Sequence, residues 1–208
     1  MTKLSLKKIF AISLFAILAA YIAFNVPQTQ KNLVYPFRYR DKVEEYSARY
    51  RVDKFLAVSV MKVESNFTEG AISKSGAVGL MQIMPETAHW IAYRLDEEPP
   101  TINQLHDCDT NIKYGIWYLS ELEEEFFDND VLALAAYNAG RGNVWNWIDK
   151  GGWRKNFSDV DSIPYLETRV YVKKVLACRE KYYELYGTPQ SAGKLFAEKS
   201  TEKLFAKK

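Results

Sequence analysis

The sequence has few of the side chains that hold metals or disulfide frameworks. It contains two cysteines and two histidines among 208 residues, too few for a zinc or iron–sulfur site at any standard ligand spacing. We therefore expect no metal and no cofactor. A charge excess is missing as well, since 28 basic side chains face 26 acidic ones. A nucleic-acid-binding protein usually carries a strong basic excess or stripe, so nucleic acid is not an expected partner.

Sustained alternation of apolar and polar residues, the pattern of a half-buried strand, is also absent. Hydrophobic residues make up 48% of the chain, enough for a sizeable core. Helical periodicity is common instead, and the helices it predicts span 39–50, 54–65, 85–95, 111–127, 130–140 and 164–186. We expect Asp53 to cap the second of these, and Asp109 or Thr110 to cap the fourth. The sequence therefore predicts an all-α fold with one compact domain.

The chain has one long hydrophobic run, residues 9–26, and it carries no charge. About 18 residues reach the lower range for crossing a bilayer as a helix. Lys3, Lys7 and Lys8 flank it on the N-terminal side, which favours residues 1–8 in the cytoplasm and the rest outside. No small-x-small cleavage pattern and no lipoprotein cysteine follows. We predict an uncleaved signal anchor that crosses the membrane once, with cleavage and secretion as the alternative.

The rest of the chain divides by composition. Residues 27–34 are polar and lack periodicity, which is typical of a short linker. The folded domain is expected over 35–187. Residues 188–208 hold a weak lysine-rich repeat and are predicted to form a basic, flexible tail; the alternative is that the tail rests on an anionic surface.

The stretch Glu64–Pro85 combines special residues over a short distance. Its first residue ends an apolar helix, on the face that also carries Ala57, Val60 and Met61. Several glycines follow in the loop. A carboxylate near a helix C-terminus is slightly unfavourable with the helix dipole. Position alone allows two interpretations, a solvated side chain at a helix end or a functional carboxyl.

Four segments carry a resemblance to a known family. In chain order they are ESNF, SGAVGLMQIMPETA, ALAAYNAGRGNV and IPYLETRVYVKKV. They resemble the signature segments of the soluble-lytic-transglycosylase-like domain, over roughly residues 35–186. That resemblance implies a lysozyme-like, goose-type helical fold and peptidoglycan glycan strands as the substrate. It also implies that the protein acts in cell-wall remodelling or turnover. The predicted anchor would then lie in a bacterial cell membrane, with the domain on the extracytoplasmic side.

The resemblance also assigns roles to residues. Glu64 matches the family's catalytic acid/base. The positions that match its glycan-binding residues are Ser73, Gly76, Gln82, Met84, Tyr137, Asn138, Glu167 and Tyr171. From the residues alone, simpler interpretations remain. The two tyrosines could be core packing, Glu167 could form a structural ion pair, and Ser73 and Gln82 could hydrogen-bond to the loop backbone.

The predicted chemistry uses a single carboxyl. Most glycosidases use two, whereas in this family the C6 hydroxyl of muramic acid attacks its own C1 and closes a 1,6-anhydro ring. Glu64 must then be protonated near neutral pH, and burial raises a carboxyl pKa. Met61, Met84 and Tyr137 are the expected apolar wall. The alternatives are a goose-type lysozyme that hydrolyses the same bond, and an inactive peptidoglycan-binding scaffold for wall-synthesis proteins or secretion machinery. A disulfide between Cys108 and Cys178 is left open.

Overall fold

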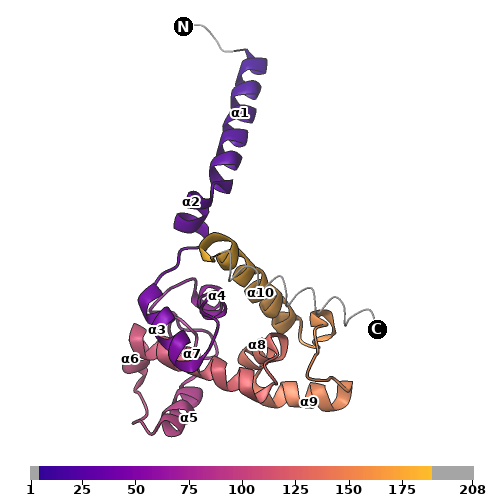
Figure 1. Cartoon of the computed structure of the whole chain (residues 1–208). Helices are drawn as coiled ribbons and strands as arrows, with labels where there is room; N and C mark the ends of the chain where they lie inside the picture. Colours follow the sequence, from indigo (N-terminus) through magenta and orange to yellow (C-terminus); the bar gives the residue numbers. More distant parts are fainter. Residues whose placement is uncertain (1–4, 189–208) are drawn as a thin grey trace.

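A computed structural model describes residues 5–188 (Figure 1). Apart from Thr188, the predicted basic tail lies outside the described residues. The elements are α1 (Leu6–Asn25), α2 (Pro27–Thr29), η1 (Gln30–Val34), α3 (Arg40–Tyr50), α4 (Lys54–Ser65), α5 (Pro85–Leu95), α6 (Ile102–Leu105), α7 (Cys108–Glu125), α8 (Asp130–Ala139), α9 (Arg141–Gly151), η2 (Val160–Ser162) and α10 (Leu166–Tyr186). Residues 5–188 contain no strand beyond isolated bridges of Val78 with Ile72 and Ile83. The all-α prediction is confirmed.

Local chemistry accounts for several helix starts. The Asp53 side chain accepts a hydrogen bond from the Phe55 N–H and caps α4, as predicted. Pro85 occupies the first turn of α5, where its missing N–H has no partner to lose. The cap predicted for α7 is wrong. Asp107, and neither Asp109 nor Thr110, caps α7 by accepting from the Thr110 N–H at 2.9 Å.

Three helices differ from the sequence prediction. The connector after α5 contains the short helix α6, started by a capping box in which Thr101 and Gln104 exchange hydrogen bonds. For residues 144–148 the sequence predicts a short helix or turn that Gly151 and Gly152 break. They are part of the longer helix α9, which begins directly after Gly140 and ends at this glycine pair. Pro164 lies just outside α10 instead of in its first turn. The intervening Tyr165 is extended, so α10 begins at Leu166.

The core forms around α4. Seven consecutive residues of this helix, from Phe55 to Met61, are buried. Helix α4 packs against α3 and α10. Helix α7 packs against α3 and α8, and α8 also packs against α10. The predicted apolar side of α7 is confirmed, because Ile112, Ile116, Leu119, Leu122 and Phe126 are all fully buried.

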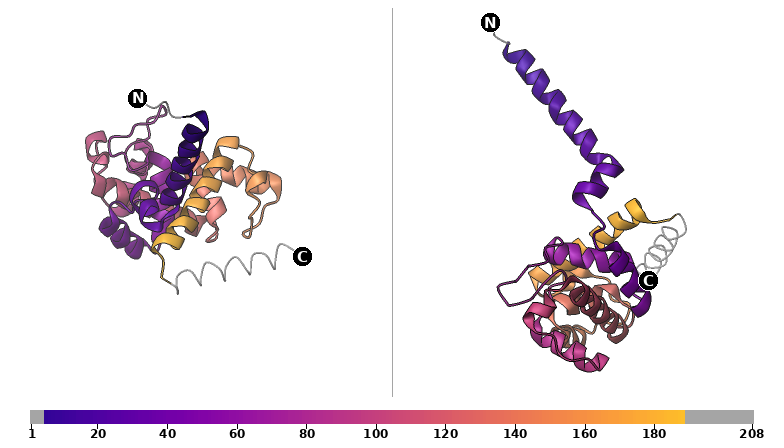
Figure 2. Two further views of the ribbon diagram at one scale, coloured as in Figure 1. Left: turned by 90° about the horizontal axis from the view of Figure 1, so that it is seen from above. Right: turned by 90° about the vertical axis from the view of Figure 1, so that its left-hand side faces the viewer.

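Helix α1 projects away from the domain (Figures 1 and 2). None of its residues is buried. Its 20 residues and mean hydropathy of 1.9 make it long and apolar enough to cross a membrane.

The predicted linker, residues 27–34, is helical and touches the domain. The Tyr186 hydroxyl at the end of α10 donates to the carbonyls of Tyr35, at 2.8 Å, and Lys31, at 3.2 Å. Beside it, the Tyr182 hydroxyl donates to the carbonyl of Pro36 at 2.9 Å. These bonds hold the chain that follows α1 to the C-terminal end of α10.

Candidate active site

Glu64 lies in the last turn of α4. Its carboxyl is largely buried because the helix that carries it lies in the middle of the core. Burial raises the pKa of Glu64 to about 7; an interaction with the Tyr171 hydroxyl opposes the rise, and the negative charge of Glu167 adds to it. A carboxyl with this pKa holds a proton in a large share of molecules at neutral pH and can also release it, as acid and base chemistry requires.

Two tyrosines from different helices lie close to this carboxyl. Tyr137 comes from α8 and Tyr171 from α10. Burial raises the pKa of both hydroxyls, and the charge of Glu64 raises it further. The Tyr137 hydroxyl donates to the Met81 carbonyl at 2.8 Å. The buried Tyr171 hydroxyl makes no hydrogen bond of standard geometry to the described residues, while lying within reach of the Glu64 carboxyl.

The loop between α4 and α5 reaches the surroundings of Glu64 at Leu80, whose carbonyl accepts from Ser65, and at Met81, whose carbonyl accepts from Tyr137. Both the side chain and the backbone of Ser73 close the turn at Ser73–Ala77. The Ala77 N–H donates to Ser73 Oγ at 2.9 Å, and the Gly76 N–H donates to the Ser73 carbonyl at 3.0 Å. The hydroxyl proton of Ser73 makes no hydrogen bond within the described part of the chain. Ser73 therefore both holds the turn and keeps one donor for a ligand.

Gln82 has a similar double character. It adopts a left-handed backbone conformation, with φ of 50°. Its side-chain amide nitrogen donates to the carbonyls of Gly79 at 2.9 Å and Ala71 at 3.3 Å. The loop-stabilising role is thus real, and the amide oxygen is left to accept from a ligand. Met84, at the end of the loop, is 37% exposed, whereas Met61 and Met81 are fully buried.

The remaining predicted residues lie at helix ends. Glu167 is exposed in the first turn of α10, one turn before Tyr171, and its charge reaches Glu64. Asn138 is half-buried near the end of α8, directly after Tyr137. Three helix ends and the loop therefore bring Glu64, Tyr137, Tyr171 and Glu167 together.

Two residues that the sequence analysis missed hold the loop in place. The Ser65 hydroxyl donates to the carbonyl of Leu80 at 2.7 Å. Asn111, fully buried on α7, accepts from the Met81 N–H at 2.7 Å and donates to the carbonyls of Val78 and Leu105, both at 2.9 Å. The sequence feature that marks Asn111 is an amide side chain on the apolar side of α7. Its partners in the loop, Val78 and Met81, lie about 30 residues away in sequence.

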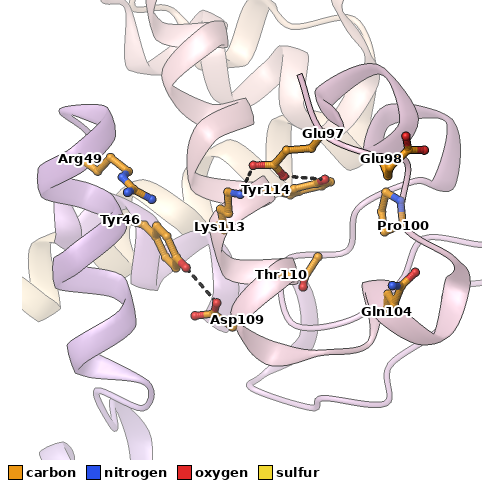
Figure 3. A pocket seen from close by; sticks show the side chains of 10 residues that line it. All are labelled: Tyr46, Arg49, Glu97, Glu98, Pro100, Gln104, Asp109, Thr110, Lys113 and Tyr114. Carbon is orange, nitrogen blue, oxygen red and sulfur yellow. Dashed lines mark hydrogen bonds and ion pairs between the residues drawn. The ribbon is translucent and has the colours of Figure 1, made fainter. Parts of the chain in front are cut away.

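A cavity of about 300 Å³ lies elsewhere, between α3, α7 and the connector after α5 (Figure 3). Its polar side chains bond to one another: the Tyr46 hydroxyl donates to Asp109 at 3.0 Å, and Lys113 pairs with Glu97. None of the predicted site residues lines it. This cavity is separate from the site at Glu64.

Among residues 5–188 there is no group of three or more side chains placed to hold a metal ion. Cys108 and Cys178 are both free thiols. Cys108 lies beside Tyr39 and Glu69, whereas Cys178 lies beside Ser59 and Lys62.

An all-α domain that holds a largely buried carboxyl at a helix end, near a structured loop and two tyrosines, has the architecture of the lysozyme-like class. Comparison with known proteins narrows this class. A family model for the transglycosylase SLT domain matches residues 41–160. The chain belongs to the transglycosylase SLT domain family.

Individual relatives agree with this assignment. The chain is 36% identical over 154 residues to the soluble lytic murein transglycosylase of Escherichia coli strain K12, covering 73% of this chain and 24% of that protein. It is 30% identical over 170 residues to the membrane-bound lytic murein transglycosylase C of Haemophilus ducreyi, covering 71% and 46%. The crystal structure of the 70 kDa soluble lytic transglycosylase of Escherichia coli superposes with a TM-score of 0.71 at 33% identity, covering 81% of this chain and 28% of that one. The chain thus spans about a quarter of the length of the Escherichia coli relative.

Proposed function

We propose that this protein is a peptidoglycan lytic transglycosylase. It cleaves the β-1,4 bond between N-acetylmuramic acid and N-acetylglucosamine and leaves a 1,6-anhydromuramic acid end. The observation that carries the proposal is Glu64, the one carboxyl among residues 5–188 that combines burial, a pKa raised to about 7 and two adjacent tyrosines. The relatives' names, all lytic murein transglycosylases, support the same reaction for this chain.

In the first step, protonated Glu64 donates its proton to the glycosidic oxygen, and the bond from that oxygen to muramic acid C1 breaks. In the second, the C6 hydroxyl of the same sugar bonds to C1 and its proton returns to the Glu64 carboxylate. No water is consumed. The substrate supplies the nucleophile, so one carboxyl is sufficient.

The other nearby carboxyls do not fit the role of a second catalytic acid. Glu167 is exposed at the start of α10. Glu69 is also exposed, and it accepts a hydrogen bond of 2.5 Å from Tyr39. Retaining and inverting glycosidases place two carboxyls across the scissile bond. The arrangement around Glu64 favours the single-carboxyl route.

The unpaired Tyr171 hydroxyl has a role in this cycle. Once Glu64 has given its proton to the leaving oxygen, its carboxylate is a buried charge that needs a donor. The Tyr171 O–H can supply it, and the interaction weakens when Glu64 is protonated again. We assign the glycan contacts to the residues that surround Glu64 with unused polar groups or open faces, namely Ser73, Gly76, Gln82, Met84, Asn138 and Glu167.

The test is digestion of purified peptidoglycan by the wild type and by Glu64→Gln. Wild type should release muropeptides with anhydro ends, which are lighter than reducing ends by one water, and Glu64→Gln should release none. Reducing ends from the wild type would show a lysozyme-type hydrolase instead. Binding without cleavage by the folded wild type would show a scaffold.

We further propose that α1 is a single-pass signal anchor that holds the domain on the extracytoplasmic side of the cell membrane. Its length, hydropathy and complete exposure support this, as does the similarity to membrane-bound relatives. Protease added to intact spheroplasts should digest the domain. Recovery of a shortened protein in the soluble fraction would show cleavage after α1.

A further inference from the structure

Three helices hold two successive residues of the loop between α4 and α5. Ser65, next to Glu64 on α4, binds the Leu80 carbonyl at 2.7 Å. Asn111 on α7 accepts from the Met81 N–H at 2.7 Å, and Tyr137 on α8 donates to the Met81 carbonyl at 2.8 Å. Both backbone groups of Met81 are therefore held by side chains from different helices.

Asn111 uses its amide fully. Its oxygen accepts one hydrogen bond, and its nitrogen donates to the carbonyls of Val78 and Leu105. Gly79 fits against it with no room for a side chain, because a Cβ there would lie 2.4 Å from the Asn111 amide nitrogen. The residue thus fixes the loop at two points, Val78 and Met81, and ties both to the segment before α7.

The Met81 side chain is held equally closely. It is fully buried and packs against Gly115, one turn after Asn111 on α7; a Cβ on Gly115 would lie 2.3 Å from the Met81 sulfur. Overpacking of this kind forces neighbours to shift. The same face of α7 therefore sets the backbone and the side chain of Met81.

We propose that Asn111 is a positioning residue for Glu64: with Tyr137 it fixes Met81, so that the loop forms a rigid wall that excludes water from the catalytic carboxyl. The chain of contact runs from Asn111 to Met81, from Met81 to Tyr137, and from Tyr137 to Glu64, whose charge it senses. Asn111 does not touch the substrate in this scheme. Its effect on activity rests on the proposed function, whereas its effect on Glu64 does not.

The variants separate positioning from general stability. Asn111→Ala removes all three hydrogen bonds. Asn111→Asp keeps the acceptor for the Met81 N–H but loses the donor to the Val78 and Leu105 carbonyls, and Tyr137→Phe removes only the bond to the Met81 carbonyl. The matched controls also lose a hydroxyl that binds a distant carbonyl: Ser120→Ala, on the same helix, loses a 2.8 Å bond to Tyr50, and Tyr182→Phe loses its 2.9 Å bond to Pro36.

The first readout is steady-state cleavage of a soluble, uncrosslinked glycan strand as a function of pH. A displacement of about 1 Å at a catalytic group costs on the order of 100-fold in rate. We expect kcat to fall about 10- to 100-fold in Asn111→Ala and in Asn111→Asp, and less in Tyr137→Phe. The high-pH limb of kcat/KM should also move to lower pH in these variants, because water reaches Glu64. Both control variants should keep the wild-type limb.

The second readout is the carboxyl pKa of Glu64 by carbon-13 NMR, measured without substrate on each folded variant. Asn111→Ala should lower it toward the ordinary value of 4.5. A wild type that cleaves no peptidoglycan would end the proposed function but leave this measurement valid. The positioning role is overturned if Asn111→Asp and Tyr137→Phe fold and keep the wild-type Glu64 pKa and kcat. If Asn111→Ala does not fold, those two variants still decide the question.

Discussion

The Tyr171 hydroxyl lies within reach of the Glu64 carboxyl and is buried without a standard hydrogen bond to any other described residue. Such a donor is costly to bury without a partner, and its interaction with Glu64 is stronger when the carboxyl is ionised, because it lowers the Glu64 pKa. The pair is therefore suited to a carboxyl that alternates between acid and carboxylate.

Glu64→Gln should abolish cleavage, by at least about 1000-fold, since general acid–base catalysis contributes on this scale, and it should also stabilise the protein above neutral pH. The folded-state pKa of Glu64 is raised to about 7 from 4.5. The contribution of Glu64 to the free energy of unfolding is highest below pH 4.5 and is lost as pH rises to 7, because the folded protein must then bury a charge. At pH 8 the neutral glutamine should raise the free energy of unfolding by about 1–3 kcal/mol. Urea unfolding at pH 5 and pH 8 measures this, and equal curves at pH 8 would contradict it.

Tyr171→Phe should shift the pH dependence of activity in the opposite direction to Asn111→Ala. The Tyr171 interaction lowers the pKa of Glu64, so its loss should move the high-pH limb of kcat/KM upward. Since a hydrogen bond to a charged group contributes about 1.5–3 kcal/mol, kcat should fall about tenfold or more. Tyr182→Phe is the matched control. An unchanged limb in Tyr171→Phe would sink the pairing of this hydroxyl with Glu64.

A second buried acid, Glu123, should make stability depend on pH independently of catalysis. It lies on α7 near Asp53, Asp130 and Asp128, with Arg179 as the neighbouring cation. Arg179 binds Asp130 at 2.5 Å. Burial first, and then the neighbouring acids Asp130, Asp53 and Asp128, raise the pKa of Glu123 to about 8, against the opposing effect of Arg179.

The effect of Glu123 on the pH dependence of stability follows from its raised pKa. The folded protein holds the proton between pH 4.5 and 8 and the unfolded chain does not, so stability falls as pH rises through this window. Glu123→Gln should flatten the fall while leaving kcat unchanged. The melting temperature at pH 5, 7 and 9 measures it. Glu124→Gln, on the exposed neighbour, is the control and should melt like the wild type at each pH.

Tyr186→Phe should loosen the segment after α1. The variant loses the hydroxyl that binds the carbonyls of Lys31 and Tyr35. Trypsin should then cut at Lys31 several-fold faster than in the wild type, while the melting temperature of the domain stays close to its original value. Tyr93→Phe, at an 81% exposed position, is the control. Equal cleavage rates in all three proteins would show that these bonds do not restrain the segment.

The sequence predicted the features that depend on local patterns. The apolar run before Glu64 predicted a buried helix, and the proline at 85 predicted the start of α5; both are confirmed. The cap of α7 was misplaced because Asp107, Asp109 and Thr110 can each cap a helix, and only the tertiary path of the chain selects Asp107. The sequence did not predict the role of Asn111, because that role depends on contacts with Val78 and Met81. Periodicity describes one helix at a time and carries no information on such contacts.

Helix α10 connects the segment after α1 with the candidate active site. Fifteen residues separate Tyr171 from Tyr186, which at roughly 1.5 Å per residue is about 22 Å. Tyr186 holds the chain that leaves α1, and Tyr171 lies at Glu64. With α1 in the membrane, as proposed, the height at which a glycan strand is cut is then set by the length and tilt of one rigid helix. Only strands that pass within a few tens of ångströms of the bilayer would come within range.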